Sequence, residues 1–336
     1  GLAISSIFAC SGFAALSGSS LATAAAMGRI AIPEMVKAGY RPSIASGSIA
    51  AGGTIGALIP PSILMIIYGI IAETSVTKVF LGGISIGIAT AIAYTLVILV
   101  ISLTRPDVIP RRAEVDEGEG ARVFLSLLPV LVLILIVFGG LFSGLFTATE
   151  AGAIGALGTF VVAGATGKLT RKAISRSLIE TVTTTGSLLI IGFAATMFTR
   201  FLGLSGLQSF IAQAVAGADI TYVGLMFIIV LIYLALGTFM EPFGAMLVTL
   251  PVFLPVLEAQ HIDLVWFGVL VVKLLEIGMI TPPVGLNVFV IKNVASKYVS
   301  VVQVFKGVIP FLLSDILVVA LVIAFPALVL FLPDLF

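Results

Sequence analysis

The sequence predicts an all-α polytopic membrane protein with inverted repeats, two re-entrant hairpins and two broken helices. Three observations support this fold class: the composition, the length of the apolar runs and an internal repeat. Of the 336 residues, 60% are hydrophobic and 10% charged, whereas soluble domains are about 45–50% apolar and about 25% charged. The composition therefore excludes a soluble enzyme and a nucleic-acid-binding protein. The apolar runs are long and continuous, unlike the alternating segments of about ten residues that build outer-membrane barrels.

Apolar runs and helix-breaking residues define the predicted elements in order. The helical segments are 1–16, 21–28, 43–72, 79–104, 122–141, 149–166, 178–202, 206–217, 221–237, 243–258, 263–296 and 307–333. Clusters of Ser, Gly and Pro interrupt four of these apolar regions, at 17–20, 52–61, 238–242 and 278–285, because such residues end or kink helices. Segment 206–217 is amphipathic. The basic stretch 168–176, with interleaved Leu and Ile, is typical of an interfacial segment.

An internal repeat relates the first part of the chain to the second with a shift of 222 residues. Matching pairs are Pro33 and Pro255, Ile55 and Ile277, Gly56 and Gly278, and Pro60-Pro61 and Pro282-Pro283. After a three-residue insertion, Val79-Phe80 matches Val304-Phe305. Repeats that pair broken helices indicate a secondary transporter with its site near the middle of the membrane.

The distribution of basic residues predicts the orientation. If the breaks at 17–20 and 238–242 turn back without crossing, 14 of the 17 Lys and Arg residues fall on one side. They are Arg29, Lys37, Arg41, Arg105, Arg111, Arg112, Arg122, Lys168, Arg171, Lys172, Arg176, Lys292, Lys297 and Lys306. By the positive-inside rule this side is cytoplasmic, so the C-terminus is expected outside and the two repeats have inverted topology.

The first pair of breaks offers oxygen ligands at the expected depth of the membrane. In Ser17-Gly18-Ser19-Ser20, hydroxyls and freed carbonyls suit Na⁺, and the following helix N-terminus favours an anion. In the break at 52–61, prolines leave preceding carbonyls unpaired, and these can coordinate a cation. The alternatives are a small-residue packing motif at the first break and a simple proline kink at the second.

The second pair of breaks repeats this arrangement and adds a carboxylate. The tip Gly237-Thr238-Phe239-Met240-Glu241-Pro242 places Glu241 deep in apolar sequence, where an ionisable group is expected to be functional because its burial is costly. The alternative is a structural ion pair. The matching broken helix runs from Gly278 to Asn287.

Other charged residues within the apolar segments have more ordinary interpretations. Lys273 and Glu276 are three residues apart on one helix and are expected to pair with each other. Asp315 is expected to cap or pair within the scaffold, and Glu150 to be a first-turn acid. Arg200 either extends to the membrane surface or faces the cavity and binds a carboxylate.

Enzyme chemistry has no support in the sequence. The single cysteine excludes an intrachain disulfide and a cysteine-cluster metal site, and the single histidine excludes a His-rich metal site. Neither HExxH nor a P-loop nor a nucleophile elbow is present.

At these motifs the sequence resembles the large membrane subunit (DctM type) of the tripartite ATP-independent periplasmic (TRAP) transporters. The resemblance covers essentially the whole chain, and the family's N-terminal scaffold helices are expected to be missing. It rests on Ser17 to Ser20, Met27-Gly28-Arg29, Pro33-Glu34-Met35, Lys37 to Tyr40, Pro60-Pro61-Ser62 with Tyr68-Gly69, Thr149-Glu150-Ala151, Gly237 to Pro242 and Ile280 to Asn287.

The resemblance implies a permease of the bacterial inner (cytoplasmic) membrane that imports organic anions, carboxylates above all, with Na⁺ as coupling ion and no cofactor. Its partners would be a small four-helix membrane subunit, a periplasmic substrate-binding protein and the lipid bilayer, with no nucleic acid. An elevator mechanism is implied, which assigns transport repeats to 1–78 and 221–298. Scaffold helices would occupy 79–177 and 299–336, and a connecting helix and amphipathic arm 178–220.

The family pattern also implies the sites. One Na⁺ site would comprise Ser17, Gly18, Ser19, Gly56 and Pro60. The other would comprise Thr238, Met240, Glu241, Gly278, Thr281 and Pro282. Substrate would contact Ser20, Pro61, Ser62, Pro283, Gly285 and Asn287, together with Arg200. Many members have Asp where this chain has Glu241, which is one methylene longer.

Three rival functions remain for the sequence. A stand-alone Na⁺/carboxylate symporter without a binding protein would share the repeats. An ion channel would need a continuous polar pore, and an intramembrane enzyme would need a base to activate Ser17 or Ser19.

Overall fold

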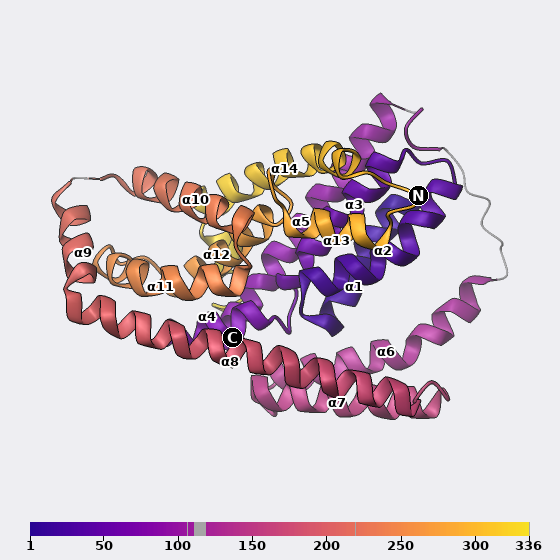
Figure 1. The fold of residues 1–336 in the computed structure, drawn as a ribbon, viewed down its shortest axis with the longest axis horizontal. Coiled ribbons are helices and arrows are strands. Elements are labelled where there is room, and N and C mark those ends of the chain that lie inside the picture. Colours follow the sequence, from indigo (N-terminus) through magenta and orange to yellow (C-terminus); the bar gives the residue numbers. More distant parts are fainter. Residues whose placement is uncertain (106, 111–118, 219, 336) are drawn as a thin grey trace. The chain divides into compact units, whose positions relative to one another are not determined.

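The computed structural model describes residues 1–105, 107–110, 119–218 and 220–335. Within these ranges the chain is helical and contains no strand (Figure 1). Arg111 and Arg112, used above for orientation, lie outside the described residues. The chain divides into two compact units, Gly1–Ala113 with Phe210–Phe336, and Glu114–Ser209.

The first unit holds both sequence repeats. Its helices are α1 (Leu2–Ser17), α2 (Ser20–Lys37), α3 (Pro42–Thr54), a 3₁₀ turn (Ile55–Ala57), α4 (Ile63–Ile71), α5 (Val76–Thr104), α10 (Tyr222–Phe239), α11 (Pro242–Ala259), α12 (Leu264–Gly278), α13 (Leu286–Val294), α14 (Val301–Ala324) and α15 (Ala327–Leu330). α9 (Leu207–Gly217) connects the second unit to α10. Each predicted break therefore overlaps a connection between two helices. The break predicted at 52–61 begins later than expected, because Gly52 and Gly53 lie inside α3, which continues to Thr54.

The helix boundaries repeat with the same shift as the sequence. Moving α2 by 222 residues gives Pro242–Ala259, which is α11. The N-caps also correspond, since Ser19 accepts a hydrogen bond from the Ala22 amide and Glu241 accepts one from the Gly244 amide. Both Pro–Pro peptide bonds at the breaks are cis. The internal repeat is thus a repeat of structure as well as of residues.

Three predicted segments have clearly different limits in the structure. The helix predicted over 21–28 continues to Lys37 as α2. The last span ends at Ala324 instead of continuing to 333, because Pro326 follows and has no backbone N–H to continue the helix. The segment predicted from 178 begins earlier, at Arg171, where the Thr170 hydroxyl accepts a hydrogen bond from the Ala173 amide. The basic stretch 168–176 therefore continues directly into a long helix.

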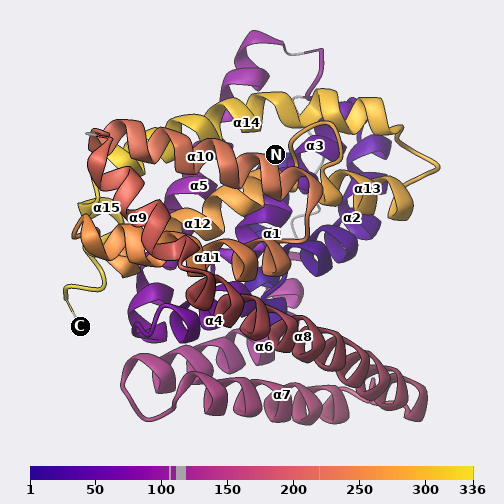
Figure 2. The same ribbon diagram turned by 60° about the vertical axis from the view of Figure 1, so that its left-hand side comes forward.

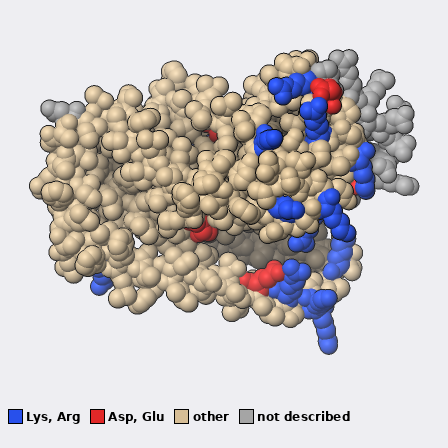
Figure 3. All heavy atoms as spheres, turned by 45° about the horizontal axis from the view of Figure 1, so that its top comes forward, with Lys and Arg blue, Asp and Glu red and all other residues tan. Residues whose placement is uncertain are grey.

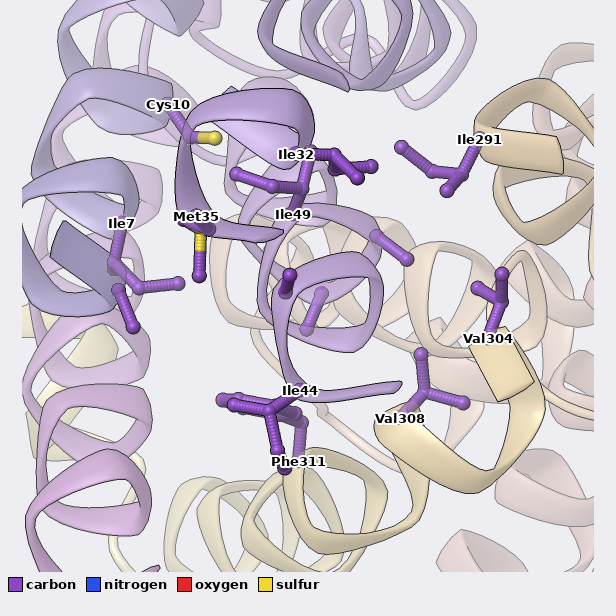
Figure 4. Close-up of a cluster of buried hydrophobic side chains, with 14 of the residues drawn as sticks. Ile7, Cys10, Ile32, Met35, Ile44, Ile49, Ile291, Val304, Val308 and Phe311 are labelled. Carbon is purple, nitrogen blue, oxygen red and sulfur yellow. The ribbon is translucent and has the colours of Figure 1, made fainter. Parts of the chain in front are cut away.

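The core of the first unit joins helices from both repeats. α2 packs along α3, α10 along α12, and α3 along α14, as Figures 1 and 2 show. Buried side chains from α1, α2, α3, α13 and α14 form one cluster (Figure 4). The α3–α14 contact is a backbone contact, because a methyl group at Gly47 would overlap the backbone of Gly307.

Replacing Gly47 with alanine is expected to prevent α3 and α14 from packing and to abolish a monodisperse folded protein. The added carbon meets backbone that cannot rotate away, and overpacking of this kind costs about 1–3 kcal/mol or more. The matched control is Gly12→Ala in α1, where nothing lies within 4 Å of the added carbon. Size-exclusion profiles and melting in detergent compare the two; similar profiles would contradict the packing argument.

The second unit contains α6 (Glu119–Phe142), α7 (Ala148–Ala165) and α8 (Arg171–Ser205). α6 packs against α7. α7 begins with a capping box, in which the Thr147 hydroxyl and the Glu150 carboxylate satisfy each other's backbone amides. Glu150 is therefore the first-turn acid that the sequence predicts.

The protein is a multi-pass membrane protein. Six of the described helices, α5, α7, α8, α10, α11 and α14, are long and apolar enough to span a bilayer. Many large apolar side chains are exposed along them, such as Leu103, Leu189 and Phe227, and Figure 3 shows broad areas of the visible face without charged side chains. Such apolar surface requires lipid as its solvent.

Candidate functional site

The tip of the first hairpin, between α1 and α2, lies against the break between α3 and α4. Gly18 has a φ of 59°, and a side chain there would overlap the carbonyl oxygen of Pro61. A methyl group at Gly56 would lie 3.1 Å from the carbonyl oxygen of Ser19. The structure thus brings the residues predicted for the first Na⁺ site into one neighbourhood: Ser17, Gly18, Ser19, Gly56 and Pro60.

Thr23 belongs to this neighbourhood and was missed by the sequence analysis. It is fully buried, and its hydroxyl donates to the Ser19 carbonyl at 2.8 Å and lies 2.9 Å from the Ser17 hydroxyl. A methyl group at Gly56 would be 3.0 Å from this hydroxyl. Its position one turn after the Ser-rich tip, on the same helix face, is the signal that could have identified it.

The tip of the second hairpin, between α10 and α11, lies against the break between α12 and α13. A side chain at Gly278 would overlap the backbone of Gly237, and one at Gly237 would come within 2.9 Å of the Leu275 carbonyl oxygen. The two breaks of each repeat therefore meet in the same way, tip against broken helix. This contact brings the segments of the second predicted Na⁺ site together: Thr238, Met240 and Glu241 with Gly278, Thr281 and Pro282.

The hydroxyls of Thr238 at the second tip and Thr281 in the matching break each bond to the carbonyl four residues earlier. The Thr238 hydroxyl donates to the Leu234 carbonyl at 2.8 Å, and the Thr281 hydroxyl donates to the Ile277 carbonyl at 2.7 Å. Each hydroxyl oxygen keeps lone pairs for another ligand. Glu241 is exposed and accepts the Gly244 amide at 3.2 Å.

A side-chain hydrogen bond joins the two repeats at the centre of the first unit. The Ser20 hydroxyl, at the first tip, donates to Glu276 Oε1 at 3.0 Å and lies 3.5 Å from Met279 Sδ in the second break. Ser20 and Glu276 are 256 positions apart in the sequence. Glu276 is a site residue that the sequence analysis missed, because its spacing from Lys273 suggested a local pair.

Lys273 does not pair with Glu276. Its ammonium group lies 2.6 Å from Asp315 Oδ1 on α14, with both side chains buried, and it sits 5.6 Å from the centre of the Tyr94 ring. The Tyr94 hydroxyl donates to the other Asp315 oxygen at 2.7 Å and lies 3.2 Å from the Thr54 hydroxyl. Asp315 was expected to pair within the scaffold; it does bond Tyr94 of segment 79–177, but its charged partner is Lys273 of the second repeat. The expected Lys273–Glu276 pair is wrong because the lysine reaches across to α14.

The residues predicted to contact substrate have different surroundings. Ser62 is buried and caps α4 by accepting the Met65 amide, next to Pro61. Gly285 is the N-cap of α13 and has a φ of 62°, two residues after Pro283. Asn287 is fully buried on α13. Arg200 is exposed on α8, in the second unit.

Four helices begin at these breaks, and the breaks supply hydroxyl, carbonyl and carboxylate oxygens. α2, α4, α11 and α13 start at Ser20, Ile63, Pro242 and Leu286. Helix N-termini attract anions, whereas hard oxygen ligands attract small cations. An arrangement of both kinds in one membrane-embedded unit can hold an organic anion beside coupling cations.

Comparison with known proteins gives one consistent family. Residues 1–328 match the family described as "Tripartite ATP-independent periplasmic transporter, DctM component". The C4-dicarboxylate TRAP transporter large permease protein DctM of Pseudomonas aeruginosa is 35% identical over 335 residues, covering 99% of this chain and 78% of that protein.

Two further relatives have names that give other substrates. The sialic acid TRAP transporter permease protein SiaT of Haemophilus influenzae is 33% identical, covering 96% of this chain and 52% of that protein. The isethionate TRAP transporter permease protein DctMQ of Oleidesulfovibrio alaskensis is 32% identical, covering 98% of this chain and 52% of that protein.

Proposed function

Because the chain belongs to the DctM component family of the tripartite ATP-independent periplasmic transporters, we propose that it is the permease subunit of a Na⁺-coupled importer of organic anions. The protein is a transporter component and not an enzyme. We propose three further points: Na⁺ is the coupling ion, carboxylates are the substrates, and transport uses an elevator movement.

The observation that carries the proposal is the matched contact of each hairpin tip with a broken helix. Gly18 approaches Pro61 in the first repeat, and Gly237 approaches Gly278 in the second. Discontinuous helices of this kind place unwound carbonyls and helix ends at the substrate and ion sites of secondary transporters. We assign one Na⁺ to each tip, with the residues named above.

Coupling between the organic anion and Na⁺ is expected because their charges are opposite. An organic anion placed at the N-termini of α2 and α13 adds negative charge to a site that already contains carboxylates. Bound Na⁺ ions offset that charge, so each ligand raises the affinity for the other. In the elevator movement, the hairpins and broken helices would carry both across the bilayer together.

The proposed partners follow the family. TRAP large permeases work with a small membrane subunit and a periplasmic binding protein, and we propose a four-helix subunit and a binding protein for this chain. We place the protein in the bacterial inner membrane with its C-terminus in the periplasm. The related transporters are named for C4-dicarboxylates, sialic acid and isethionate, all of which are organic anions.

The test is uptake into proteoliposomes that contain the full-length permease and its small subunit. The binding protein is added outside, and a Na⁺ gradient is imposed for each carboxylate of a panel. Uptake that needs both Na⁺ and the binding protein is expected. Uptake with Na⁺ alone would establish the stand-alone symporter instead, and uptake that ignores the Na⁺ gradient would overturn Na⁺ coupling.

Ser19→Ala is expected to raise the Na⁺ concentration that gives half-maximal uptake by roughly 2- to 12-fold. The change removes one neutral oxygen ligand, worth roughly 0.5–1.5 kcal/mol. Because Ser19 also caps α2, the matched control is Ser75→Ala, which removes the same kind of cap from α5 away from the tips. An equal response of both variants would show that Ser19 acts only as a cap.

A further inference from the structure

We infer that Glu276, Asn287 and Ser20 form an additional site for a monovalent alkali cation such as Na⁺, located between the two repeats. None of these residues is assigned to a Na⁺ site above, and Ser20 and Asn287 are among the residues expected to contact substrate. The inference rests on the proposed function in one respect, the assumption that the permease binds Na⁺ at all.

The carboxyl group of Glu276 is buried, and only one of its two oxygens has a hydrogen-bond partner. The side chain is 1% exposed. Ser20 donates one hydrogen bond to Oε1, and Oε2 has no hydrogen-bond partner. A buried carboxylate without a compensating charge is strongly unfavourable, so the site requires positive charge next to Oε2.

Within the described residues, this carboxylate has no ion-pair partner of its own. Lys273 is engaged with Asp315 at 2.6 Å, which forms a pair that is neutral as a whole. Among the residues that the structure describes, no Lys, Arg or His lies within ion-pairing distance of Glu276. Since the side chain is enclosed, a bound small cation is the natural source of the missing charge.

Asn287 provides the second ligand. It is fully buried, and neither Oδ1 nor Nδ2 has a hydrogen-bond partner. Its backbone amide donates to the Met279 carbonyl at 3.0 Å, and Ser20 contacts the side chain of the same Met279. Met279, in the second break, therefore contacts both the Ser20 hydroxyl and the backbone of Asn287.

A cation and a proton can each neutralise Glu276, but they join different numbers of oxygen atoms. A proton on Oε2 makes one hydrogen bond to one acceptor, whereas a small cation is bound by several oxygens at once. A cation can bind Glu276 Oε2 and Asn287 Oδ1 together, with the Ser20 hydroxyl as a further oxygen. One carboxylate balances a single positive charge, whereas Ca²⁺ and Mg²⁺ require more oxygen ligands and more negative charge.

The site depends on both repeats. Ser20 comes from the first hairpin tip, while Glu276 and Asn287 come from the broken helix of the second repeat. A cation bound here contacts both repeats of the first unit. Cation binding at this site therefore requires the two repeats to be packed against each other.

The experiment is equilibrium binding of ²²Na⁺ to the full-length permease with its small subunit in lipid nanodiscs, without substrate. Glu276→Gln keeps the shape of the side chain and removes its charge. This variant is expected to bind one Na⁺ fewer per permease than the unaltered protein. The matched control is Glu258→Gln, the same change at an exposed position on α11, which is expected to leave the number unchanged.

A second variant keeps the proposal testable where Glu276→Gln does not fold. Asn287→Ala retains the carboxylate and is expected to weaken one class of bound Na⁺ about tenfold. Unchanged Na⁺ binding in both variants would overturn the inference while leaving the proposed function intact. If Glu276→Gln binds as many Na⁺ ions as the unaltered protein but no longer takes up a proton, the inference is overturned and Glu276 is a proton site instead. Absence of Na⁺ binding by the unaltered permease would overturn the proposed function as well.

Discussion

Replacing Lys273 with methionine is expected to destabilise the first unit by about 3–5 kcal/mol, a large fraction of the total stability of a domain. The substitution removes the positive partner of Asp315, which is fully buried and lies 2.6 Å from the lysine ammonium. Asp315 would keep one hydrogen bond, from Tyr94, but would carry an unpaired charge. The measurement is the melting temperature of the purified permease in detergent.

Two controls separate this effect from the loss of a lysine in general. Lys37→Met breaks the exposed pair with Glu34 and is expected to leave the melting temperature unchanged, because exposed pairs contribute little. The double variant Lys273→Met with Asp315→Asn is expected to recover most of the lost stability, because it is neutral and the asparagine can still accept from Tyr94. A double variant as unstable as the single one would show that lysine packing, and not the unpaired charge, is what matters.

Glu241→Gln is expected to abolish Na⁺-driven uptake at physiological Na⁺ concentration. A charged oxygen ligand contributes roughly 1.5–3 kcal/mol, so its neutralisation corresponds to a roughly 10- to 150-fold weaker Na⁺ affinity. The structure makes this substitution informative, because glutamine retains a carbonyl oxygen that can accept the Gly244 amide and preserve the cap of α11. Initial uptake rates over a Na⁺ series give the result.

The comparison with Glu241→Asp decides what the side chain does. Aspartate keeps the charge and is a good N-cap, so this variant is expected to retain uptake and a normal melting temperature. If Glu241→Gln transports at a near-normal rate, Glu241 is only the cap of α11. A melting temperature that falls in Glu241→Gln would assign the loss of uptake to the helix and not to the ion.

Much of the fold could be predicted because helix breaks depend on local chemistry. The prolines at 60–61 and 282–283 lack N–H donors, and the Ser-Gly tip at 17–20 permits the left-handed conformation of Gly18. The repeat follows from the same residues recurring 222 positions later. Where local chemistry was overlooked, at Thr170 and Pro326, the predicted limits of a helix were wrong.

The candidate site was only partly predictable. The tips and breaks were recognised, since they are marked by Ser, Gly and Pro. Thr23 was missed because it lies inside an apolar helix, and Glu276 because Lys273 stands three residues before it. Helical spacing describes neighbours on one helix, but Lys273 faces α14 and Glu276 faces the first hairpin tip.

Residues read along the chain were enough to predict a helical membrane protein with a repeated pattern of hairpin and broken helix. Composition, the length of apolar runs and the positions of helix-breaking residues are properties of the chain itself, so they can be recognised from the sequence. The partners of the buried groups depend on how distant helices pack: Lys273 pairs with Asp315, Ser20 bonds to Glu276, and each tip contacts its broken helix. These contacts join residues up to 256 positions apart. They exist because the packing of glycine-lined backbones brings distant helices within hydrogen-bond distance, which no spacing along a single helix encodes.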